Sequence, residues 1–350
     1  MTVMPTDGNV NGRIGVGLLG APAVPEMVEL AQLAEANGFE SVWVAETRMT
    51  RDGVAPCAAI AMGTSRIKIG TGIINVYTRG AVLTAVTFVG LDEISGGRII
   101  MGLGPGSPLV LLPQGVAFHK PLTRLRETID VVQALLRGET VTFEGETIQV
   151  QGARLEIRPP REHIPLYLGV TGPRALELAG EKGDGVMLNA FLPTGYVERA
   201  LERIDAGARR AGKTLDDVDV SSAIVVSVDE DAGVARDRAR AFIALYLSLF
   251  PNIAKETDLP DDLVARTRET FNNEGQAAAA RHIDDSVVDF LTASGTPEEC
   301  HSRIEAYRAA GVQLPILFPL DPNVRMSIET LGPMAQKSVQ KEVSHEASRG

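Results

Sequence analysis

One alternation recurs along most of the chain and restricts its fold more than any other feature. Short apolar runs rich in β-branched residues are each followed by a segment with helical character. The eight runs are residues 14–19, 41–45, 67–73, 98–103, 165–169, 185–188, 218–228 and 314–318. Because they are apolar on both faces, they are typical of strands in a parallel sheet that helices cover.

Helical signals fill the intervals between the runs. Met27, Leu30, Ala31 and Ala34 have the spacing of one helix face. Residues 296–299 combine a threonine cap, a proline at the first helical position and a glutamate at the third, which predicts a helix to residue 310. The other predicted helices cover about 81–93, 122–136, 173–182 and 195–211, the last with Thr194 as its cap.

Eight strands that alternate with helices favour a (β/α)₈ TIM barrel over a doubly wound sheet. We expect one domain over residues 13–335. A segment of alternating residues at 140–157 predicts a hairpin-like insertion, and 231–295 reads as a mostly helical insertion. The polar ends, 1–12 and 336–350, are expected to be disordered.

Composition limits the partners and the compartment. The formal net charge of −11 and the pI near 5.1 argue against a polyanionic partner such as nucleic acid. The two cysteines lie far apart, so no disulfide scaffold is expected and a reducing compartment fits. Because no run approaches about eighteen apolar residues and the first residues lack a signal pattern, we expect a cytoplasmic protein without a membrane segment.

In TIM barrels the functional groups lie at the carboxyl ends of the strands, which selects a short set of residues. Glu46 and Arg48 follow the second run and could form a polar site over a reactive ring, although such a pair is more often an exposed loop. Gly104 and Gly106 follow the fourth run. They would let the backbone approach a flat ligand, unless the turn needs glycine for its conformation alone.

The fifth run ends at Gly169 and leads through Thr171, Gly172 and Pro173 into a predicted helix. Free N–H groups at the start of that helix would make an anion site that suits a cofactor phosphate, and the hydroxyl of Thr171 could add to it. The alternative is an ordinary turn in which Thr171 caps the helix.

Three further polar residues are candidates for contact with a substrate. Arg79 follows the third run, Asn189 follows the sixth, and His119 lies in a loop after the fourth, where a lone histidine is more often only solvated. No metal site is expected, because the five histidines show no paired metal spacing. A Gly-x-Gly-x-x-Gly pattern at 15–20 suggests a Rossmann dehydrogenase, but two of its glycines lie inside an apolar run and the helix begins only near Pro25.

Several of these segments together resemble the bacterial-luciferase-like superfamily. The resemblance rests on residues 37–46, 70–79, 91–98, 102–106, 172–180 and 183–186, and it covers about residues 13–320. The third run, with its asparagine and the Tyr-Thr-Arg that follows, is most similar to the methylenetetrahydromethanopterin reductase branch. Members of that branch use the deazaflavin coenzyme F-420, whereas other branches use FMN.

The resemblance implies how a cofactor would be held. A cis peptide bond between Gly72 and Ile73 would back the central ring, and Asn75 could hydrogen-bond the polar edge of that ring. The phosphate-bearing tail would lie against Thr171, Gly172 and Pro173. The resemblance also implies a homodimer.

The chain also departs from the family pattern. Many relatives have a histidine directly after the glutamate of the second run, where this chain has Thr47, and Arg-His-Pro after the third run, where it has Arg79-Gly80-Ala81. Without those histidines, Glu46 becomes the preferred residue for proton handling. Arg48 would then fix a substrate carbonyl or carboxylate.

The sequence thus predicts an oxidoreductase that moves a hydride between coenzyme F-420 and a small organic substrate. The alternatives are an FMN-dependent monooxygenase that uses oxygen, a non-catalytic flavin-binding relative and a nicotinamide-dependent Rossmann enzyme. The insertion at 231–295 would shape the substrate mouth. Its candidate apolar lining residues are Tyr246, Phe250, Phe271 and Phe290.

Overall fold

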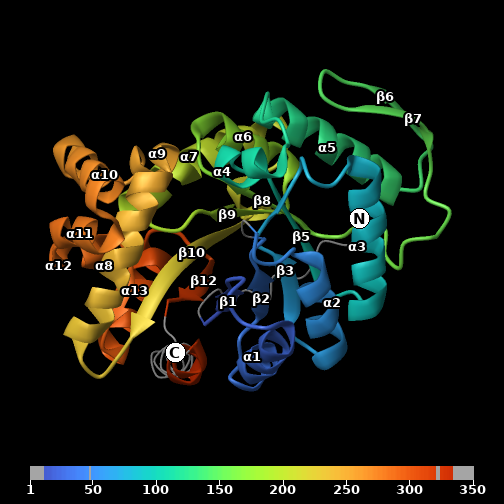
Figure 1. Ribbon diagram of the computed structural model, residues 1–350. Helices are drawn as coiled ribbons and strands as arrows, with labels where there is room; N and C mark the ends of the chain where they lie inside the picture. The colour runs from blue at the N-terminus through green and yellow to red at the C-terminus, as the bar shows by residue number, and fades with distance from the viewer. Residues whose placement is uncertain (1–11, 47–48, 321–323, 334–350) are drawn as a thin grey trace, which may run out of the picture.

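The computed structural model describes residues 12–46, 49–320 and 324–333 (Figure 1). Arg48, the first eleven residues and the segment 336–350 lie outside the described residues, and so do the expectations that concern them.

Eight parallel strands form a closed barrel, which confirms the predicted fold class. Around the barrel they are β1 (Gly15–Leu18), β2 (Ser41–Val44), β3 (Lys68–Thr71), β5 (Ile99–Gly104), β8 (Leu166–Val170), β9 (Gly185–Leu188), β10 (Asp219–Val228) and β12 (Leu314–Pro319). The barrel closes because β12 pairs with β1 while β10 pairs with both β9 and β12. The glycines of the Rossmann-like pattern belong to β1 and its following turn, and Gly17 faces the Phe318 ring inside the barrel.

Helices surround the barrel, and all of those named here except α2 were predicted from the sequence. They are α1 (Val24–Ala36), α2 (Val54–Gly63), α3 (Ala81–Ser95), α5 (Pro121–Leu136), α6 (Pro173–Lys182), α7 (Thr194–Arg210) and α13 (Pro297–Ala309). The threonine–glutamate capping box of α13 is confirmed. The prediction that Thr194 caps α7 is wrong, because Thr194 is already helical and Pro193 takes the cap position without a side-chain hydrogen bond.

Aromatic and charged side chains fill the amino-terminal part of the barrel. Trp43 and Tyr167 meet inside it with ring centroids 5.3 Å apart. The Tyr167 hydroxyl donates to Asp219, and Arg13 forms ion pairs with both Asp219 and Glu40. This packing closes one end of the barrel and leaves the carboxyl ends of the strands as the open end.

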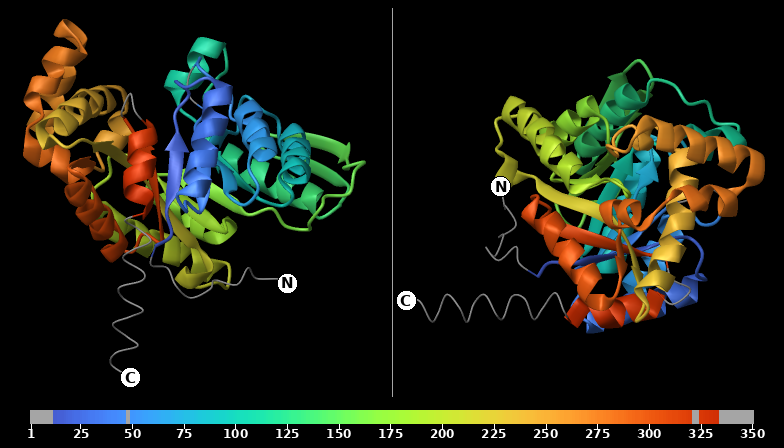
Figure 2. Two further views of the ribbon diagram at one scale, coloured as in Figure 1. Left: turned by 90° about the horizontal axis from the view of Figure 1, so that it is seen from below. Right: turned by 90° about the vertical axis from the view of Figure 1, so that its left-hand side faces the viewer.

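A helical subdomain lies between β10 and α13, where the insertion was expected. It contains α8 (Ala232–Leu249), α9 (Pro251–Ala254), α10 (Asp261–Glu274), α11 (Gln276–Ala279), the short 3-10 helix η3 (Ala280–His282) and α12 (Asp285–Leu291). It ends in β11 (Ala293–Gly295), which sequence analysis did not predict and which pairs with the end of β10. Figure 2 shows these helices at one side of the barrel, opposite the hairpin.

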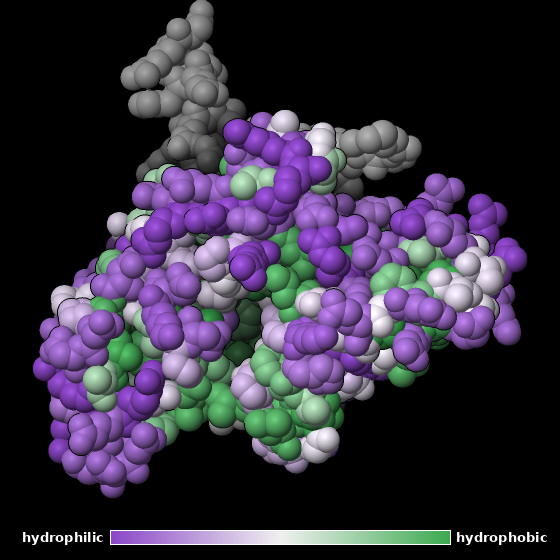
Figure 3. Space-filling view, turned by 90° about the horizontal axis from the view of Figure 1, so that it is seen from above, coloured by the Kyte–Doolittle hydropathy of each residue, from purple (hydrophilic) through white to green (hydrophobic). Residues whose placement is uncertain are grey.

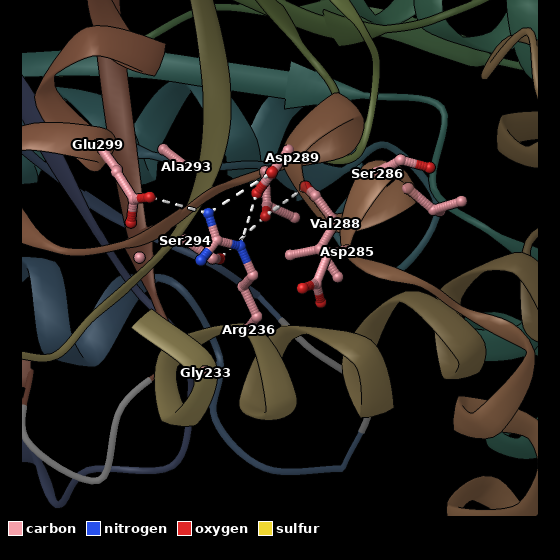
Figure 4. Close-up of polar contacts among 12 residues, drawn as sticks. Gly233, Arg236, Asp285, Ser286, Val288, Asp289, Ala293, Ser294 and Glu299 are labelled. Atoms are coloured by element: carbon pink, nitrogen blue, oxygen red, sulfur yellow. Dashed lines mark hydrogen bonds and ion pairs between the residues drawn. The ribbon is translucent and has the colours of Figure 1, made fainter. Parts of the chain in front are cut away.

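One arginine ties this subdomain to the barrel helices. Arg236 of α8 forms ion pairs with Asp289 of α12 at 2.9 Å and with Glu299 of α13 at 3.1 Å (Figure 4). Glu299 is also the capping-box glutamate of α13, so the same carboxylate serves both contacts. The two acids keep the pKa of Arg236 above its ordinary value.

The hairpin consists of the antiparallel strands β6 (Val141–Glu144) and β7 (Gln149–Ala153). A buried carboxylate from α5 holds its turn. Glu127 accepts hydrogen bonds from the backbone N–H groups of Glu146, Thr147 and Ile148 and from the Thr147 hydroxyl. These donors outweigh the effect of burial and keep the pKa of Glu127 below its ordinary value.

Among the described residues, no helix has the length and apolar character that a membrane crossing requires. The same part of the chain contains no cluster of three or more side chains suited to a metal ion. Cys57 and Cys300 are both buried and free.

Candidate active site

A cavity of about 530 Å³ opens at the carboxyl ends of the barrel strands. Its floor comes from the strand ends and one wall comes from α8. Most of its lining is apolar, and its polar side chains are Glu46, Thr50, Asn189 and Tyr246 within the described residues. The space-filling view in Figure 3 shows a hollow whose deep part is hydrophobic and whose rims are mostly hydrophilic.

A bulge in the third strand forms part of the floor. β3 pairs Gly70 with Ile100, whereas the short strand β4 (Ile74–Asn75) pairs Ile74 with Leu103, so this side of the ladder holds one extra residue. Across the bulge, the Thr71 hydroxyl donates to the Gly102 carbonyl and accepts from the Gly102 N–H. The peptide bond between Gly72 and Ile73 is cis, as the resemblance implied.

Two glycines make room for the side chain of Ile73. A Cβ added at Gly169 would lie 2.6 Å from Ile73 Cγ2, and one added at Gly104 would lie 2.6 Å from Ile73 Cδ1. Gly72, Ile73 and Gly169 line the cavity. Gly104 does not line the cavity. Because it has no side chain, the Ile73 side chain can pack directly against its backbone.

Glu46 lies on the cavity wall just beyond β2. Its Oε1 accepts a hydrogen bond from Asn75 Nδ2 at 2.9 Å, and its Oε2 accepts one from the Gly53 N–H at 3.2 Å. Burial raises the pKa of Glu46 above its ordinary value, and the Gly53 hydrogen bond and the charge of Arg79 only partly oppose this effect. Burial thus makes the Glu46 carboxyl easier to protonate than an exposed glutamate, which suits a group that takes part in proton transfer.

Asn75 holds Glu46 and the loop after β4 together. Its Oδ1 accepts from the backbone N–H groups of Tyr77 and Thr78, and its Nδ2 donates to Glu46 and to the Thr78 hydroxyl. Both amide hydrogens are thus engaged within the protein. In this arrangement Asn75 positions Glu46 and has no free donor for the edge of a cofactor ring.

The other charged candidates lie further from the cavity. Arg79 Nη2 is 3.9 Å from Asp52, and Arg79 acts on Glu46 through its charge without lining the cavity. His119 is exposed and does not line the cavity, and its carbonyl accepts from the Tyr77 hydroxyl. The structure therefore brings Glu46, but not His119, to the cavity.

The start of α6 lies beside the end of β8. The cap position is Gly172, which has no side chain, so the alternative of a Thr171 cap is not what the structure shows. The Thr171 carbonyl accepts from the Tyr196 hydroxyl at 2.5 Å, which fixes the turn. Gly106, with a positive φ of 70°, lies next to Asn75 on the neighbouring strand end.

Sequence analysis found only part of the cavity wall that α8 provides. Tyr246 and Phe250 line the cavity, whereas Phe271 packs within the helical subdomain and Phe290 is exposed. Phe242 and Leu245 were missed. Leu245 and Tyr246 follow Phe242 by three and four residues, a spacing that could have indicated a shared helix face.

Asn189, which follows β9, faces this wall. Its Oδ1 accepts from the Tyr246 hydroxyl at 2.8 Å and from the Ala190 N–H at 2.8 Å. The side-chain oxygen of Asn189 therefore already accepts two hydrogen bonds. Nδ2 is left as the group that Asn189 offers to the cavity, and it makes no hydrogen bond to the described residues.

Comparisons with known proteins show the family of the chain. The model of the luciferase-like monooxygenase family matches residues 5–314. The chain is 35% identical to the 5,10-methylenetetrahydromethanopterin reductase of Methanolobus tindarius, over 91% of this chain and 98% of that one. It is also 35% identical to the reductase of the same name from Archaeoglobus fulgidus, over 88% and 93% of the two chains.

A solved structure shows the same fold. The coenzyme F-420-dependent tetrahydromethanopterin reductase from Methanopyrus kandleri superposes with a TM-score of 0.84 at 29% identity, and the match covers 91% of this chain and 97% of that one. The family that the strand-end motifs indicated is thus confirmed. The chain belongs to the luciferase-like monooxygenase family.

Proposed function

We propose that this protein is an oxidoreductase that transfers a hydride between coenzyme F-420 and a small organic substrate. The observation that carries the proposal is the identity of 35% with methylenetetrahydromethanopterin reductases along nearly their whole length. The relatives also include a putative coenzyme F-420-dependent oxidoreductase of Mycobacterium tuberculosis, which is 30% identical.

The floor of the cavity fits a flat ring system. Gly72, Ile73 and Gly169 present backbone and one aliphatic side chain there, and a Cβ at Gly169 would push Ile73 out of place. When bound, coenzyme F-420 supplies a carbon at ring position 5 that carries the hydride. We assign the support of the ring to Gly72 and Ile73, with Gly104 and Gly169 keeping Ile73 in position.

The start of α6 suits the phosphate-bearing tail. Thr171, Gly172 and Pro173 lead into this helix, where N–H groups without a helical partner favour a negative charge. Gly106 lies on the adjacent strand end and would let the tail pass close to the backbone.

We assign proton transfer to Glu46 and its positioning to Asn75. A carboxyl with a raised pKa can give a proton to a substrate oxygen as the neighbouring carbon receives the hydride. The charge of Arg79 lowers the pKa of Glu46. We keep Arg48 as a candidate for contact with the substrate. Asn189 offers its Nδ2 to the cavity as a hydrogen-bond donor.

We further propose that the protein, built from one domain over residues 13–335, forms a homodimer through α2 and α3. Helix α2 contains no charged residue, and Met62, Leu83, Val86 and Ile94 are exposed on these two helices. A second copy would cover this apolar face. The buried free cysteines fit a reducing, cytoplasmic location.

Equilibrium binding of coenzyme F-420 and of FMN to the purified protein tests the proposal. We expect tight binding of the deazaflavin and weak binding of FMN. Preference for FMN would reject the proposal and favour an oxygen-using monooxygenase, because nitrogen at ring position 5 lets reduced FMN react with oxygen. Binding of neither would favour a relative without cofactor-dependent activity.

A further inference from the structure

A second cavity of about 490 Å³ lies beside the cavity at the barrel mouth, which we call the first cavity. Its described lining comes from the end of β1, from the loop and first turns of α1, from the end of β12 and from α8. Four residues line both cavities, and they are Leu19, Ala21, Phe242 and Leu320. Their side chains therefore form the boundary between the two spaces.

Phe242 contributes the only aromatic ring among these four residues. Leu19 and Leu320 directly follow β1 and β12, so the barrel fixes where they lie, and Ala21 is small. Phe242 instead comes from α8 in the helical subdomain, and its side chain is half-buried. A smaller side chain at position 242 would therefore connect the two cavities without a change in the barrel strands.

The first cavity has limited room for a substrate once a cofactor ring is in place. Pockets that hold a small ligand usually have volumes of about 300–1,000 Å³. The first cavity, at about 530 Å³, would have to hold both the ring and the reacting part of the substrate. The boundary at Phe242 then decides whether the substrate can extend further on this side.

The second cavity lies across the barrel from the proposed site of the cofactor tail. β12 and β1 are neighbours, and β8 follows β1 after β2, β3 and β5 in the closed ring of strands. The start of α6, to which we assign the tail, comes directly after β8. A substrate that extends from the ring on the side opposite the tail therefore meets Phe242.

We propose that Phe242 is a specificity-determining residue that limits how far a substrate extends from the ring toward β1 and β12. In the wild type the part of the substrate on this side stays within the first cavity, so compact groups are accepted there and long ones are not. The second cavity becomes available when the ring of Phe242 is removed. This inference deepens the proposed function and rests on it for the position of the ring.

Hexanamide and decanamide are suitable probes, because they share an uncharged amide and differ only in the length of the alkyl chain. Calorimetry with saturating oxidised coenzyme F-420 measures their affinities without turnover. A buried methylene raises affinity by about fourfold. We expect Phe242→Ala to raise the ratio of decanamide affinity to hexanamide affinity by roughly tenfold or more over the wild type, the effect of about two buried methylenes. An unchanged ratio would overturn the inference.

Glu26→Trp identifies the space that the longer chain enters. Glu26 is exposed on α1 and lines only the second of the two cavities, so a tryptophan there would occupy that cavity and leave the first one unchanged. Phe242→Ala combined with Glu26→Trp should return the ratio to near its wild-type value. Phe242→Ala combined with Glu202→Trp is the matched control, because Glu202 is exposed on α7 and lines neither cavity. If the raised ratio persists with Glu26→Trp, the chain does not enter the second cavity and the inference fails.

Phe250→Ala tests whether the loss of any ring from the cavity wall has the same effect. Phe250 lines only the first of the two cavities, so its removal opens no path to the second, and the ratio should stay near the wild-type value. An increase equal to that in Phe242→Ala would reject a particular role for Phe242. Phe242→Leu keeps more of the packing and should raise the ratio by a smaller factor, so the test remains available if the alanine variant does not fold. An unchanged ratio in Phe242→Leu would count against the boundary.

The two proposals can fail separately. If coenzyme F-420 does not bind, the proposed function fails, but the same titrations with the protein alone still compare Phe242→Ala with its two double variants. A rise in the ratio that Glu26→Trp abolishes and Glu202→Trp preserves would then support the role of Phe242 in limiting ligand length. The absence of that pattern would reject it.

Discussion

Asn75 Nδ2 donates a hydrogen bond to Glu46 Oε1 at 2.9 Å, and this contact joins the ends of two neighbouring strands. The donor is fixed from the other side, because Asn75 Oδ1 accepts from two backbone N–H groups in the next turn. The carboxyl of Glu46 is thereby held at the cavity by a residue that does not itself need to touch the substrate.

Replacing Glu46 with glutamine should remove the proton donor and leave the cavity intact. We expect kcat to fall by about 10²- to 10⁴-fold, while the affinity for coenzyme F-420 changes little. Steady-state rates and a cofactor titration measure the two effects. Glu202→Gln serves as a control, because Glu202 is exposed on α7 and does not line the cavity. Full activity in Glu46→Gln would show that another group supplies the proton.

Asn75→Asp should shift the pH profile upward. The substitution keeps an acceptor for the Tyr77 and Thr78 N–H groups, but it replaces a donor to Glu46 with a negative charge. Because the Asn75 hydrogen bond lowers the pKa of Glu46, its loss raises that pKa further. The proton transfer assigned to Glu46 needs its protonated form, so the fall of kcat with rising pH should occur at higher pH than in the wild type. Asp52→Asn should shift the pH profile to lower pH, because the charge of Asp52 raises the pKa of Glu46. If neither variant changes the pH profile, Glu46 is not the group that gives the proton.

Gly169→Ala should disturb the floor of the cavity. The new methyl would lie 2.6 Å from Ile73 Cγ2, so Ile73 must move toward the ring site. We expect cofactor binding to weaken by about 5- to 150-fold, as an overpacking cost of about 1–3 kcal/mol implies. The double variant Gly169→Ala with Ile73→Ala should recover part of the affinity. Gly80→Ala is the control, because nothing lies within 4 Å of its added Cβ.

Glu127→Gln should destabilise the hairpin. The carboxylate accepts four hydrogen bonds, and a neutral amide cannot accept all of them, so we expect a loss of about 1–3 kcal/mol in the free energy of unfolding at pH 7. The folded-state pKa is lowered, so this stabilisation is present above the unfolded-state value of about 4.3 and is lost as pH falls through the folded-state pKa. Denaturant unfolding at pH 7 and at acid pH measures the free energy of unfolding of the wild type and of the variant. The difference between the two values should become smaller at acid pH. A constant difference would mean that the charge of Glu127 does not stabilise the fold.

Leu83→Glu should break the proposed dimer. Leu83 is exposed on α3 at 53% of its surface, and a charge there would be buried between two copies. Sedimentation velocity should show a dimer for the wild type and a monomer for the variant. Val234→Glu places the same charge on α8 and should stay dimeric. If both variants keep the wild-type mass, the copies do not meet at α2 and α3.

Much of the fold could be predicted from local pattern. The bounds of α6 and β9 agree with the predicted 173–182 and 185–188, because proline, glycine and apolar runs mark their ends. Helix α2 was missed, since its sequence is small and apolar on every side and gives no amphipathic period. β11 was missed because three residues carry too little pattern to predict a strand.

The site was partly predictable for a related reason. The strand-end rule selected Glu46, Gly169 and Asn189, the resemblance added Gly72 and Ile73, and all five line the cavity. The rule cannot place side chains from an insertion, so the roles of Phe242 and Leu245 depend on how α8 packs across the barrel mouth. Nor does it distinguish a residue that faces a ligand from one that holds its neighbour, as Asn75 does.

The strand β11 marks the point at which the helical subdomain returns to the barrel. β11 pairs in parallel with the last three residues of β10, and α13 follows shortly after β11 in the sequence. Residues 232–291 therefore leave and rejoin the scaffold at neighbouring points. A protein engineer could exchange this segment as one cassette that keeps Arg236, because the ion pair of Arg236 with Glu299 of α13 joins the segment to the scaffold. Such an exchange would change the wall of the cavity while the barrel that carries the proposed cofactor site stays constant.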